Sequence, residues 1–236
     1  MDLLFRQDAY LRECAATVIG VDAEGIRLDQ TVFYPMGGGQ PGDSGQLILA
    51  DGRAIEIADT LKDQEPNTVR HVPAADQPLP DVGAQVTARI DWARRHRLMR
   101  MHTCLHLLSA LIKGDVTGGQ VSDGKGRLDF NLRETVLDKE QLTRDLNALI
   151  AGDHEVRSRW ISDEELAAKP ELVRTMSVKP PTGQGQVRLL EIVGVDLQPC
   201  GGTHVARTGE IGRVEISKIE NKGKMNRRVN IALIDL

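Results

Sequence analysis

The chain has 236 residues, 40% hydrophobic and 27% charged, a composition typical of a globular protein with one large domain or two small ones. Its net charge of −4 excludes a surface that is basic overall, so any RNA contact must depend on a local basic patch. Its three cysteines are too few and too scattered for a disulfide framework, and it shows no secretory signal or membrane-spanning apolar stretch, so we expect a cytoplasmic protein without membrane contact.

The first ninety residues predict β-strands. Short apolar or alternating runs bounded by Gly, Asp and Pro occupy residues 16–21, 25–32, 45–49 and 54–58. Residues 72–82 contain three prolines and no periodicity, and another strand is expected over 82–90. We therefore expect a first domain over residues 1–90, built as a small barrel or sandwich.

Residues 91–113 predict a long helix, because apolar side chains recur at spacings of three and four: Leu98, Met101, Leu105, Leu108 and Ile112.

Helices and strands are mixed in the rest of the chain. A hairpin is expected over 121–130 with its turn at 123–126, a second amphipathic helix over 137–151, and a short helix over 162–168 that begins with a Ser162–Glu165 capping box. Strands are expected over 187–194, 213–221 and 228–234. Residues 91–236 thus predict a second domain of the α+β class.

Four side chains have the spacing and chemistry of a metal site. His102 and His106 lie one turn apart on the predicted helix, and Cys200 and His204 flank a Gly-Gly loop. Imidazole and thiolate ligands favour zinc. Each pair alone is more often a coincidence of sequence. The zincin pattern is excluded because Thr103 stands where it requires Glu. A closed structural site and an open site with water in place of one residue both stay possible.

The remaining histidines and cysteines lack such partners. We interpret His71, His96 and His154 as surface residues. Cys14 and Cys104 are expected to be small apolar fillers, and the helical angle of Cys104 turns it away from the two helix histidines.

Several motifs occur in a fixed order along the chain. They are Phe-Tyr-Pro-x-Gly-Gly-Gly-Gln-Pro at 33–41, His-Thr-x-x-His-Leu-Leu at 102–108, Arg-Leu-Asp-Phe at 127–130, Cys-Gly-Gly-Thr-His-Val at 200–205, Thr-Gly-Glu-Ile-Gly at 208–212 and Asn-Arg-Arg-Val at 226–229. From about residue 29 to 236 the chain resembles the alanyl-tRNA synthetase editing domain and its freestanding AlaX homologues. The threonyl-tRNA synthetase editing domain is a more distant likeness.

The resemblance implies a small N-terminal β-barrel followed by an α+β editing domain. It implies Zn²⁺ bound by His102, His106, Cys200 and His204. It also implies hydrolysis of mischarged tRNA(Ala), chiefly Ser-tRNA(Ala) with Gly-tRNA(Ala) as a second candidate, while Ala-tRNA(Ala) is spared.

Three residues are catalytic candidates. Gln120 and Ser122 resemble a Gln/Ser motif of the family that could orient water or sense a substrate hydroxyl, although ordinary hairpin hydrogen bonds explain them equally well. Thr103 flanks a predicted ligand, and a buried hydroxyl there would favour serine over alanine.

The tRNA-binding candidates are a glycine run and two basic clusters. The glycine run is interpreted either as a simple turn or as a close approach to the tRNA end, and each basic cluster alone is usually a solvated face. The candidates are Gly37, Gly38, Gly39, Arg94, Arg95, Lys222, Lys224, Arg227 and Arg228. Two other functions remain open: a zinc hydrolase of small esters, and a non-enzymatic RNA-binding module stabilised by zinc.

Overall fold

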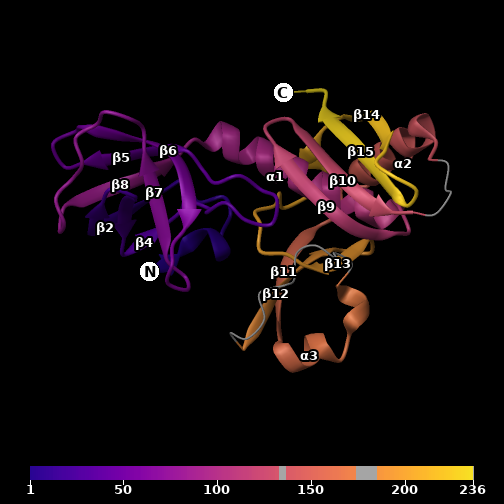
Figure 1. Ribbon diagram of the computed structural model, residues 1–236, viewed down its shortest axis with the longest axis horizontal. Helices are drawn as coiled ribbons and strands as arrows, with labels where there is room; N and C mark the ends of the chain where they lie inside the picture. Colours follow the sequence, from indigo (N-terminus) through magenta and orange to yellow (C-terminus); the bar gives the residue numbers. More distant parts are fainter. Residues whose placement is uncertain (133–136, 174–184, 236) are drawn as a thin grey trace. The chain divides into compact units, whose positions relative to one another are not determined.

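The structure is a computed structural model that describes residues 1–132, 137–173 and 185–235. The chain separates into two compact units, Met1–His96 and Arg97–Leu236, and each is described by itself. The division falls within helix α1 (Trp92–Leu111), whose first turn belongs to the first unit (Figure 1).

The first unit is a closed β-barrel with the strand order β2-β3-β7-β6-β5-β8. Two short strands, β1 and β4, pair in parallel outside the barrel, and a 3-10 turn at Leu4–Arg6 follows β1. The strands are β1 Asp2–Leu3, β2 Glu13–Asp22, β3 Gly25–Leu28, β4 Gln30–Thr31, β5 Gly45–Leu49, β6 Ala54–Lys62, β7 Val69–Pro73 and β8 Gln85–Ile90.

Alternation along the strands builds the barrel core. In β6, Ile55 and Ile57 are buried while Ala54, Glu56 and Ala58 are exposed, as a half-buried strand requires. The interior is aliphatic with one aromatic ring, Phe33, and His71 packs edge-on against that ring.

His71 is therefore not a surface residue, and that expectation was wrong. Its side chain is fully buried, with Nε2 2.8 Å from the Thr31 hydroxyl and Nδ1 3.0 Å from the Ile26 carbonyl oxygen. Burial lowers the pKa of His71 to about 4, because the charged imidazolium is disfavoured inside the barrel.

The second unit contains two antiparallel sheets and the rest of helix α1. The larger sheet has the order β14-β15-β10-β9, and the smaller one has the order β11-β12-β13. The elements are β9 Asp115–Ser122, β10 Lys125–Asn131, α2 Lys139–Ala151, β11 Val156–Ser162, α3 Asp163–Ala167, β12 Gln186–Ile192, β13 Asp196–Pro199, β14 Val214–Asn221 and β15 Asn226–Leu233, with 3-10 turns at Pro170–Leu172 and Thr208–Ile211.

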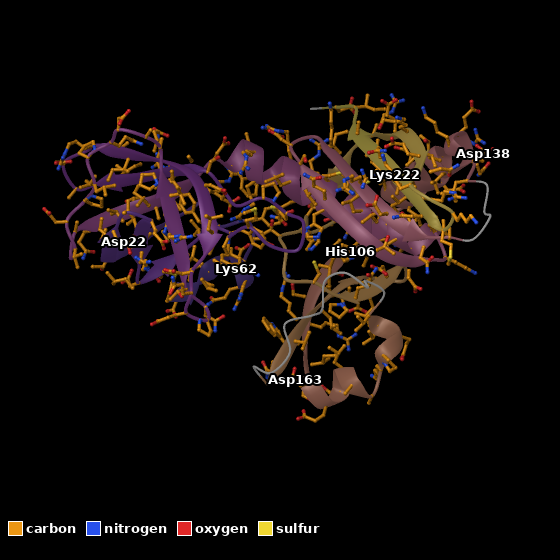
Figure 2. All side chains as sticks on the ribbon, in the orientation of Figure 1. Asp22, Lys62, His106, Asp138, Asp163 and Lys222 are labelled. Carbon is orange, nitrogen blue, oxygen red and sulfur yellow. The ribbon has the colours of Figure 1, made fainter. Side chains whose placement is uncertain are left out.

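The helices begin at side-chain caps. The Asp138 carboxylate accepts hydrogen bonds from the backbone N–H groups of Glu140 and Gln141 at the start of α2. The predicted capping box between Ser162 and Glu165 is present at the start of α3. Figure 2 marks Asp138 and also Asp163, the first residue of α3.

The α+β class with an N-terminal barrel is confirmed, but several elements differ from those predicted. The hairpin turn consists of Asp123 and Gly124 alone, with Gly124 at a φ of 71°, and the strand expected over 25–32 divides into β3 and β4. Strands β7, β11 and β13 were not predicted. Within the described ranges, no helix combines the length and apolarity needed to cross a membrane.

Candidate metal centre

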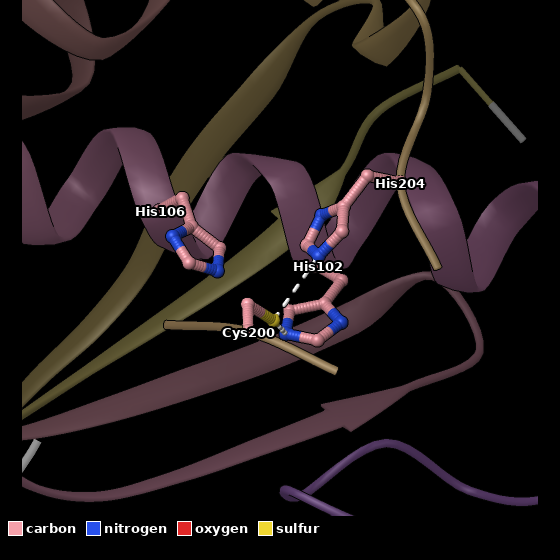
Figure 3. A group of neighbouring side chains, drawn as sticks. All are labelled: His102, His106, Cys200 and His204. Carbon is pink, nitrogen blue, oxygen red and sulfur yellow. Dashed lines mark hydrogen bonds between the residues drawn. The ribbon is translucent and has the colours of Figure 1, made fainter. Parts of the chain in front are cut away.

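Four side chains of the second unit converge on one point. The ligand atoms of His102, His106, Cys200 and His204 all lie within 4.8 Å of one another (Figure 3). Cys200 Sγ is 3.2 Å from His204 Nε2 and 3.6 Å from His102 Nε2. The three histidines are buried and Cys200 is half-buried. One cation could therefore be reached by all four side chains.

Local backbone structure explains this convergence. Helix α1 places His102 and His106 one turn apart on the same face. Cys200 follows β13 and continues its pairing, because its N–H donates to the Arg188 carbonyl oxygen (3.1 Å). The Arg188 guanidinium then donates to the carbonyl oxygens of Cys200 and Gly202, each at 2.9 Å. Arg188 thereby fixes the loop that carries the thiol.

The ring orientation of His106 is set by a buried polar chain. Its Nδ1 lies 3.1 Å from Asp196 Oδ2. The Gln198 amide in turn donates to both oxygens of the Asp196 carboxylate, at 2.9 and 2.8 Å, and to the Ser109 hydroxyl at 3.2 Å. A ring that donates Nδ1–H to a carboxylate presents Nε2 to a metal.

Thr103 has the corresponding role for His204. Its hydroxyl donates to the Met99 carbonyl oxygen (2.9 Å) and lies 3.2 Å from His204 Nδ1, and it accepts from the Val205 N–H at 3.3 Å. The predicted candidate Thr103 is thus fully buried and its hydroxyl is already engaged. These contacts favour a role in orienting His204 over direct contact with a substrate.

The electrostatics of the cluster favour a thiolate. Burial by itself raises the pKa of Cys200, but the adjacent imidazoles of His102 and His204 outweigh it and hold that pKa well below its usual value. For His106 the effects are reversed. Burial lowers its pKa, but its hydrogen bonds to Asp196 and Cys200 outweigh burial and raise the pKa to about 10. A metal ion would take the place of the proton that this arrangement holds.

The cluster fits zinc by its donor chemistry. One thiolate and three imidazoles form a mixed sulfur–nitrogen set of four, the number that a tetrahedral site requires. The Nδ1 atoms of His106 and His204 already face hydrogen-bond partners, which leaves their Nε2 atoms to the ion. Cys104 lies outside this group, and burial raises its pKa to about 12, as expected of an inert filler.

Gln120 and Ser122 lie elsewhere. In strands β9 and β10, Val121 pairs with Gly126, and a Cβ placed on Gly126 would meet Met101 of α1. Because side chains alternate along a strand, Gln120 and Ser122 point to the opposite face of the sheet, away from α1. The Gln120 amide oxygen accepts from Arg127 Nε there (3.3 Å). We therefore assign neither residue a direct step in catalysis.

The glycine run in the first unit forms a tight turn. Gly37 and Gln40 exchange backbone hydrogen bonds of 3.0 Å, and Gly38 and Gly39 have φ values of 58° and 84°, which glycine adopts without strain. The Tyr34 hydroxyl donates to the Gly37 carbonyl oxygen at 2.9 Å and holds the base of the turn. The simple turn is therefore sufficient to explain these glycines.

Arg95 is not available to phosphate, and its prediction as a tRNA contact is corrected. The side chain is fully buried, and its guanidinium bonds to both carboxylate oxygens of Asp43 and to the carbonyl oxygens of Ala9 and Val32. Arg94 is half-buried and donates to the Gly42 carbonyl oxygen at 2.7 Å. Both arginines thus support the fold of the first unit.

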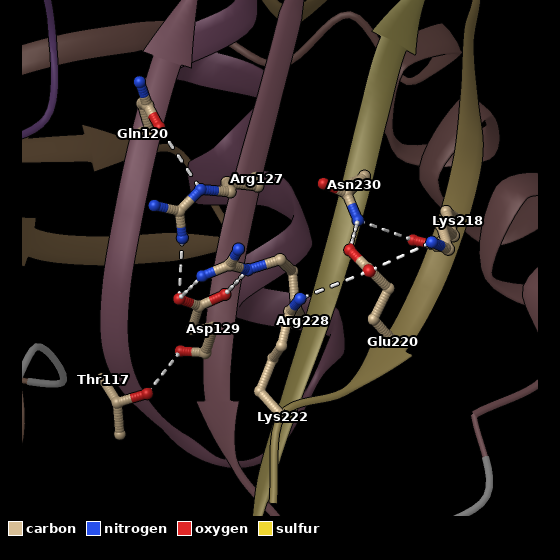
Figure 4. Close-up of polar contacts among 9 residues, drawn as sticks. All are labelled: Thr117, Gln120, Arg127, Asp129, Lys218, Glu220, Lys222, Arg228 and Asn230. Atoms are coloured by element: carbon tan, nitrogen blue, oxygen red, sulfur yellow. Dashed lines mark hydrogen bonds and ion pairs between the residues drawn. The ribbon is translucent and has the colours of Figure 1, made fainter.

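The second basic cluster is partly neutralised (Figure 4). Arg228 bonds to Asp129 through Nε and Nη2 at 2.7 and 2.9 Å, and Arg127 bonds to the same carboxylate at 2.7 Å. Lys222 lies 3.3 Å from Glu220. The Arg227 guanidinium donates to the Gly223 carbonyl oxygen, and Lys224 is exposed in the turn before β15.

Sequence reasoning missed the residues that support the cluster. Asp196 and Gln198 precede Cys200 at alternate positions, so a strand ending at Cys200 would have placed all three on one face. Nothing in the local sequence points to Arg188, because its role depends on pairing between β12 and β13.

Two family models match the chain. Residues 187–230 match the threonyl and alanyl tRNA synthetase second additional domain, and residues 7–94 match the class II (A) tRNA synthetases. The first match contains Arg188, Asp196 and both loop ligands, whereas the second covers most of the barrel unit.

Relatives are similar over nearly the whole chain. An alanyl-tRNA editing protein AlaX-M of Methanosarcina acetivorans is 36% identical over 243 residues, which cover 99% of each chain. One of Saccharolobus solfataricus is 34% identical over 235 residues, 96% of each chain. An alanine–tRNA ligase of Saccharolobus islandicus is 33% identical over 226 residues, 92% of this chain and 25% of the ligase.

Proposed function

Since the chain belongs to the AlaX-M family of alanyl-tRNA editing proteins, we propose that it hydrolyses the ester bond of mischarged tRNA(Ala) in trans. The substrates are chiefly Ser-tRNA(Ala) and also Gly-tRNA(Ala), and Ala-tRNA(Ala) is spared. The observation that carries the proposal is the convergence of three histidines and one cysteine in the unit that resembles a synthetase editing domain.

The metal is proposed to be zinc, held by His102, His106, Cys200 and His204. When bound, zinc supplies a Lewis acid that can polarise the ester carbonyl or hold the amino group of the substrate.

The residues of the chain have separable tasks in this proposal. Asp196 keeps Nε2 of His106 directed into the site, and Thr103 does the same for His204. Arg188 fixes the Cys200 loop through two carbonyl oxygens, so the thiolate keeps its position when the substrate enters. These groups are positioning residues, since each acts through a ligand.

Selectivity against alanine requires a polar pocket. Serine carries a hydroxyl that can complete hydrogen bonds there, whereas alanine would leave buried polar groups without a partner. A site that pairs with a substrate hydroxyl discriminates more strongly than one that measures a methyl group.

The tRNA contacts are proposed to come from the exposed Lys222 and Lys224 and from the half-buried Arg227. Lys222, Lys224 and Arg227 lie near the β14–β15 turn, where their charge can reach phosphate. Arg228 is shared with Asp129, so we expect it to contribute less. The Gly37–Gly39 turn is retained as a second contact in the first unit.

The direct test is release of amino acid from Ser-tRNA(Ala), Gly-tRNA(Ala) and Ala-tRNA(Ala), with wild type compared with Cys200→Ala. We expect hydrolysis of Ser-tRNA(Ala) that spares Ala-tRNA(Ala) and is lost in a folded variant. Cys104→Ala is the matched control, because it removes a thiol of helix α1 that lies outside the candidate ligand group.

Two outcomes would contradict the proposal. Equal cleavage of Ala-tRNA(Ala) and Ser-tRNA(Ala) would exclude the selectivity. A folded, zinc-loaded protein that cleaves none of the three would favour a zinc-stabilised RNA-binding module, and cleavage of small esters alone would favour a general esterase.

A further inference from the structure

A row of three residues crosses the smaller sheet of the second unit. Trp160 of β11 pairs directly with Arg188 of β12. On the other side of β12, the Cys200 N–H donates to the Arg188 carbonyl oxygen. Adjacent strands lie about 4.8 Å apart, so the Cα atoms of Trp160 and Cys200 are roughly 10 Å apart.

The side chains of this row share one face of the sheet. Residues directly opposite each other in an antiparallel pair point to the same side. Arg188 Nη2 donates to the Ser158 hydroxyl at 2.6 Å, and Ser158 lies two residues before Trp160, which assigns the side chains of Ser158 and Trp160 to that face. Asp196 and Gln198 point to α1 from the same face and lead to the Cys200 thiol. The indole is thus on the metal-centre side of the sheet.

Trp160 is unusual in this chain. It is 50% exposed, and it is one of two tryptophans in a chain with 3% aromatic residues. The other, Trp92, lies in the first unit between Tyr10, His96 and the Arg12 guanidinium. A half-exposed indole on an edge strand contributes little to a core, although such surfaces are where nucleobases stack.

We propose that Trp160 is the platform on which the 3′-terminal adenine of the aminoacyl-tRNA stacks. The proposal rests on the proposed function, which brings the ester to the metal centre. In that substrate a single ribose separates the ester from the base, and that spacing suits an ester beside Cys200 and a base over Trp160. The Arg188 guanidinium bonds to the Cys200 carbonyl oxygen and to Ser158, two residues before Trp160, so it lies between Cys200 and Trp160. Its positive charge would attract the sugar and phosphate oxygens of the nucleotide.

The first experiment is a fluorescence titration that involves no hydrolysis. In a Trp92→Phe protein, Trp160 is the remaining tryptophan reporter. The probe is 3′-deoxyadenosine that carries serine on a 3′-amide, compared with the same serine amide on an abasic ribose. We expect saturable quenching by the adenosine compound and at least a tenfold weaker response to the abasic one. Equal responses, or none, would overturn the proposal.

The second experiment measures deacylation of Ser-tRNA(Ala). Trp160→Leu keeps an apolar side chain but removes the ring, and we expect KM to rise about 5- to 100-fold with kcat largely retained. Trp160→Phe should fall between Trp160→Leu and wild type. Arg159→Ala is the matched control, since Arg159 is equally exposed but points to the opposite face of β11.

A tRNA with an abasic terminal nucleotide completes a double-perturbation cycle. If the ring and the base contact each other, Trp160→Leu will have little further effect on KM with the abasic substrate. Independent effects would refute the stack while leaving editing intact. By contrast, wild type that deacylates nothing would count against the proposed function, and the titration would still decide the role of Trp160.

Discussion

Replacing Asp196 by Asn tests whether the carboxylate behind His106 tunes the metal centre. The substitution preserves size but removes the negative charge that faces Nδ1 at 3.1 Å. It also disturbs Gln198, whose amide now donates to both carboxylate oxygens, because an asparagine can offer it only one acceptor.

The magnitude follows from burial and geometry. Asp196 is 9% exposed, so solvent screens its charge only weakly. Loss of such a partner to a ligating histidine typically weakens metal binding about 10- to 100-fold. That range corresponds to about 1.4 to 2.7 kcal/mol of binding free energy.

The assay is competition for zinc with a chromophoric chelator, supported by the visible spectrum of the cobalt-substituted protein. Asp129→Asn is the matched control. Asp129 is also a buried aspartate of the second unit, but its partners Arg127 and Arg228 lie on the sheet face away from α1. We expect the control to lose some stability and to bind zinc like wild type.

A zinc affinity within threefold of wild type in Asp196→Asn would refute this reasoning, because the carboxylate would then neither orient nor polarise His106. An equal loss in Asp129→Asn would also count against it, since the effect would then be a general loss of stability.

Three further predictions concern other buried polar groups. Thr103→Val should weaken zinc binding about tenfold while Thr103→Ser does not, because only serine keeps a hydroxyl 3.2 Å from His204 Nδ1. Equal zinc affinities of the two variants in chelator competition would exclude a role of the hydroxyl in orienting His204. Arg95→Met should lower the free energy of unfolding, measured with denaturant, by about 3 to 5 kcal/mol, because Asp43 stays buried without its partner. Adding Asp43→Asn should recover part of that loss. A double variant no more stable than Arg95→Met would argue against the pairing. His71 has a folded-state pKa of about 4, below its ordinary 6.5, so the unfolded chain binds more protons between these pH values. The free energy of unfolding should therefore fall by about 3 kcal/mol as the pH drops from 6.5 to 4. His71→Gln, measured at several pH values, should lack this pH-dependent loss.

The cluster of candidate metal ligands could be predicted because its pattern is local. His102 and His106 need only a helix to become neighbours, and Cys200 and His204 need only one loop. That the two pairs meet was an inference from their complementary chemistry and from the family resemblance. The groups behind the ligands were not predictable in this way, since Asp196 acquires its role only when β13 packs against α1.

The missed strands show the limits of hydrophobic periodicity. Strand β11 has Arg157, Ser158 and Arg159 exposed in succession, so no period of two appears in its sequence. It is nevertheless a strand, because it forms a continuous ladder with β12 at the edge of its sheet. Proline also led to a missed strand. Pro73 is the last residue of β7 and pairs with Ile57 where the β6–β7 register shifts, and at such a bulge the missing N–H is tolerated.

The charge pattern also led to a wrong prediction at Arg95, which was expected to contact tRNA but is fully buried. A run of four arginines within residues 94–100 favours a basic surface, yet the helix turns Arg95 inward to Asp43. No local feature distinguishes it from Arg94. Both bond to residues 52 positions earlier, but Arg95 is fully buried against the Asp43 carboxylate, whereas Arg94 is half-buried and donates to the Gly42 carbonyl oxygen.

The separation of the ligands along the chain bears on how the protein is made. His102 and His106 are synthesised long before Cys200 and His204, so a growing chain holds half of the candidate site until residues 200–204 are translated. Metal capture would then close the long loop between residues 106 and 200, a cross-link that reduces the entropy of the unfolded chain much as a disulfide does. If the proposed metal centre is correct, a product truncated before Cys200 would lack two of its four candidate ligands and would lose the proposed hydrolytic activity.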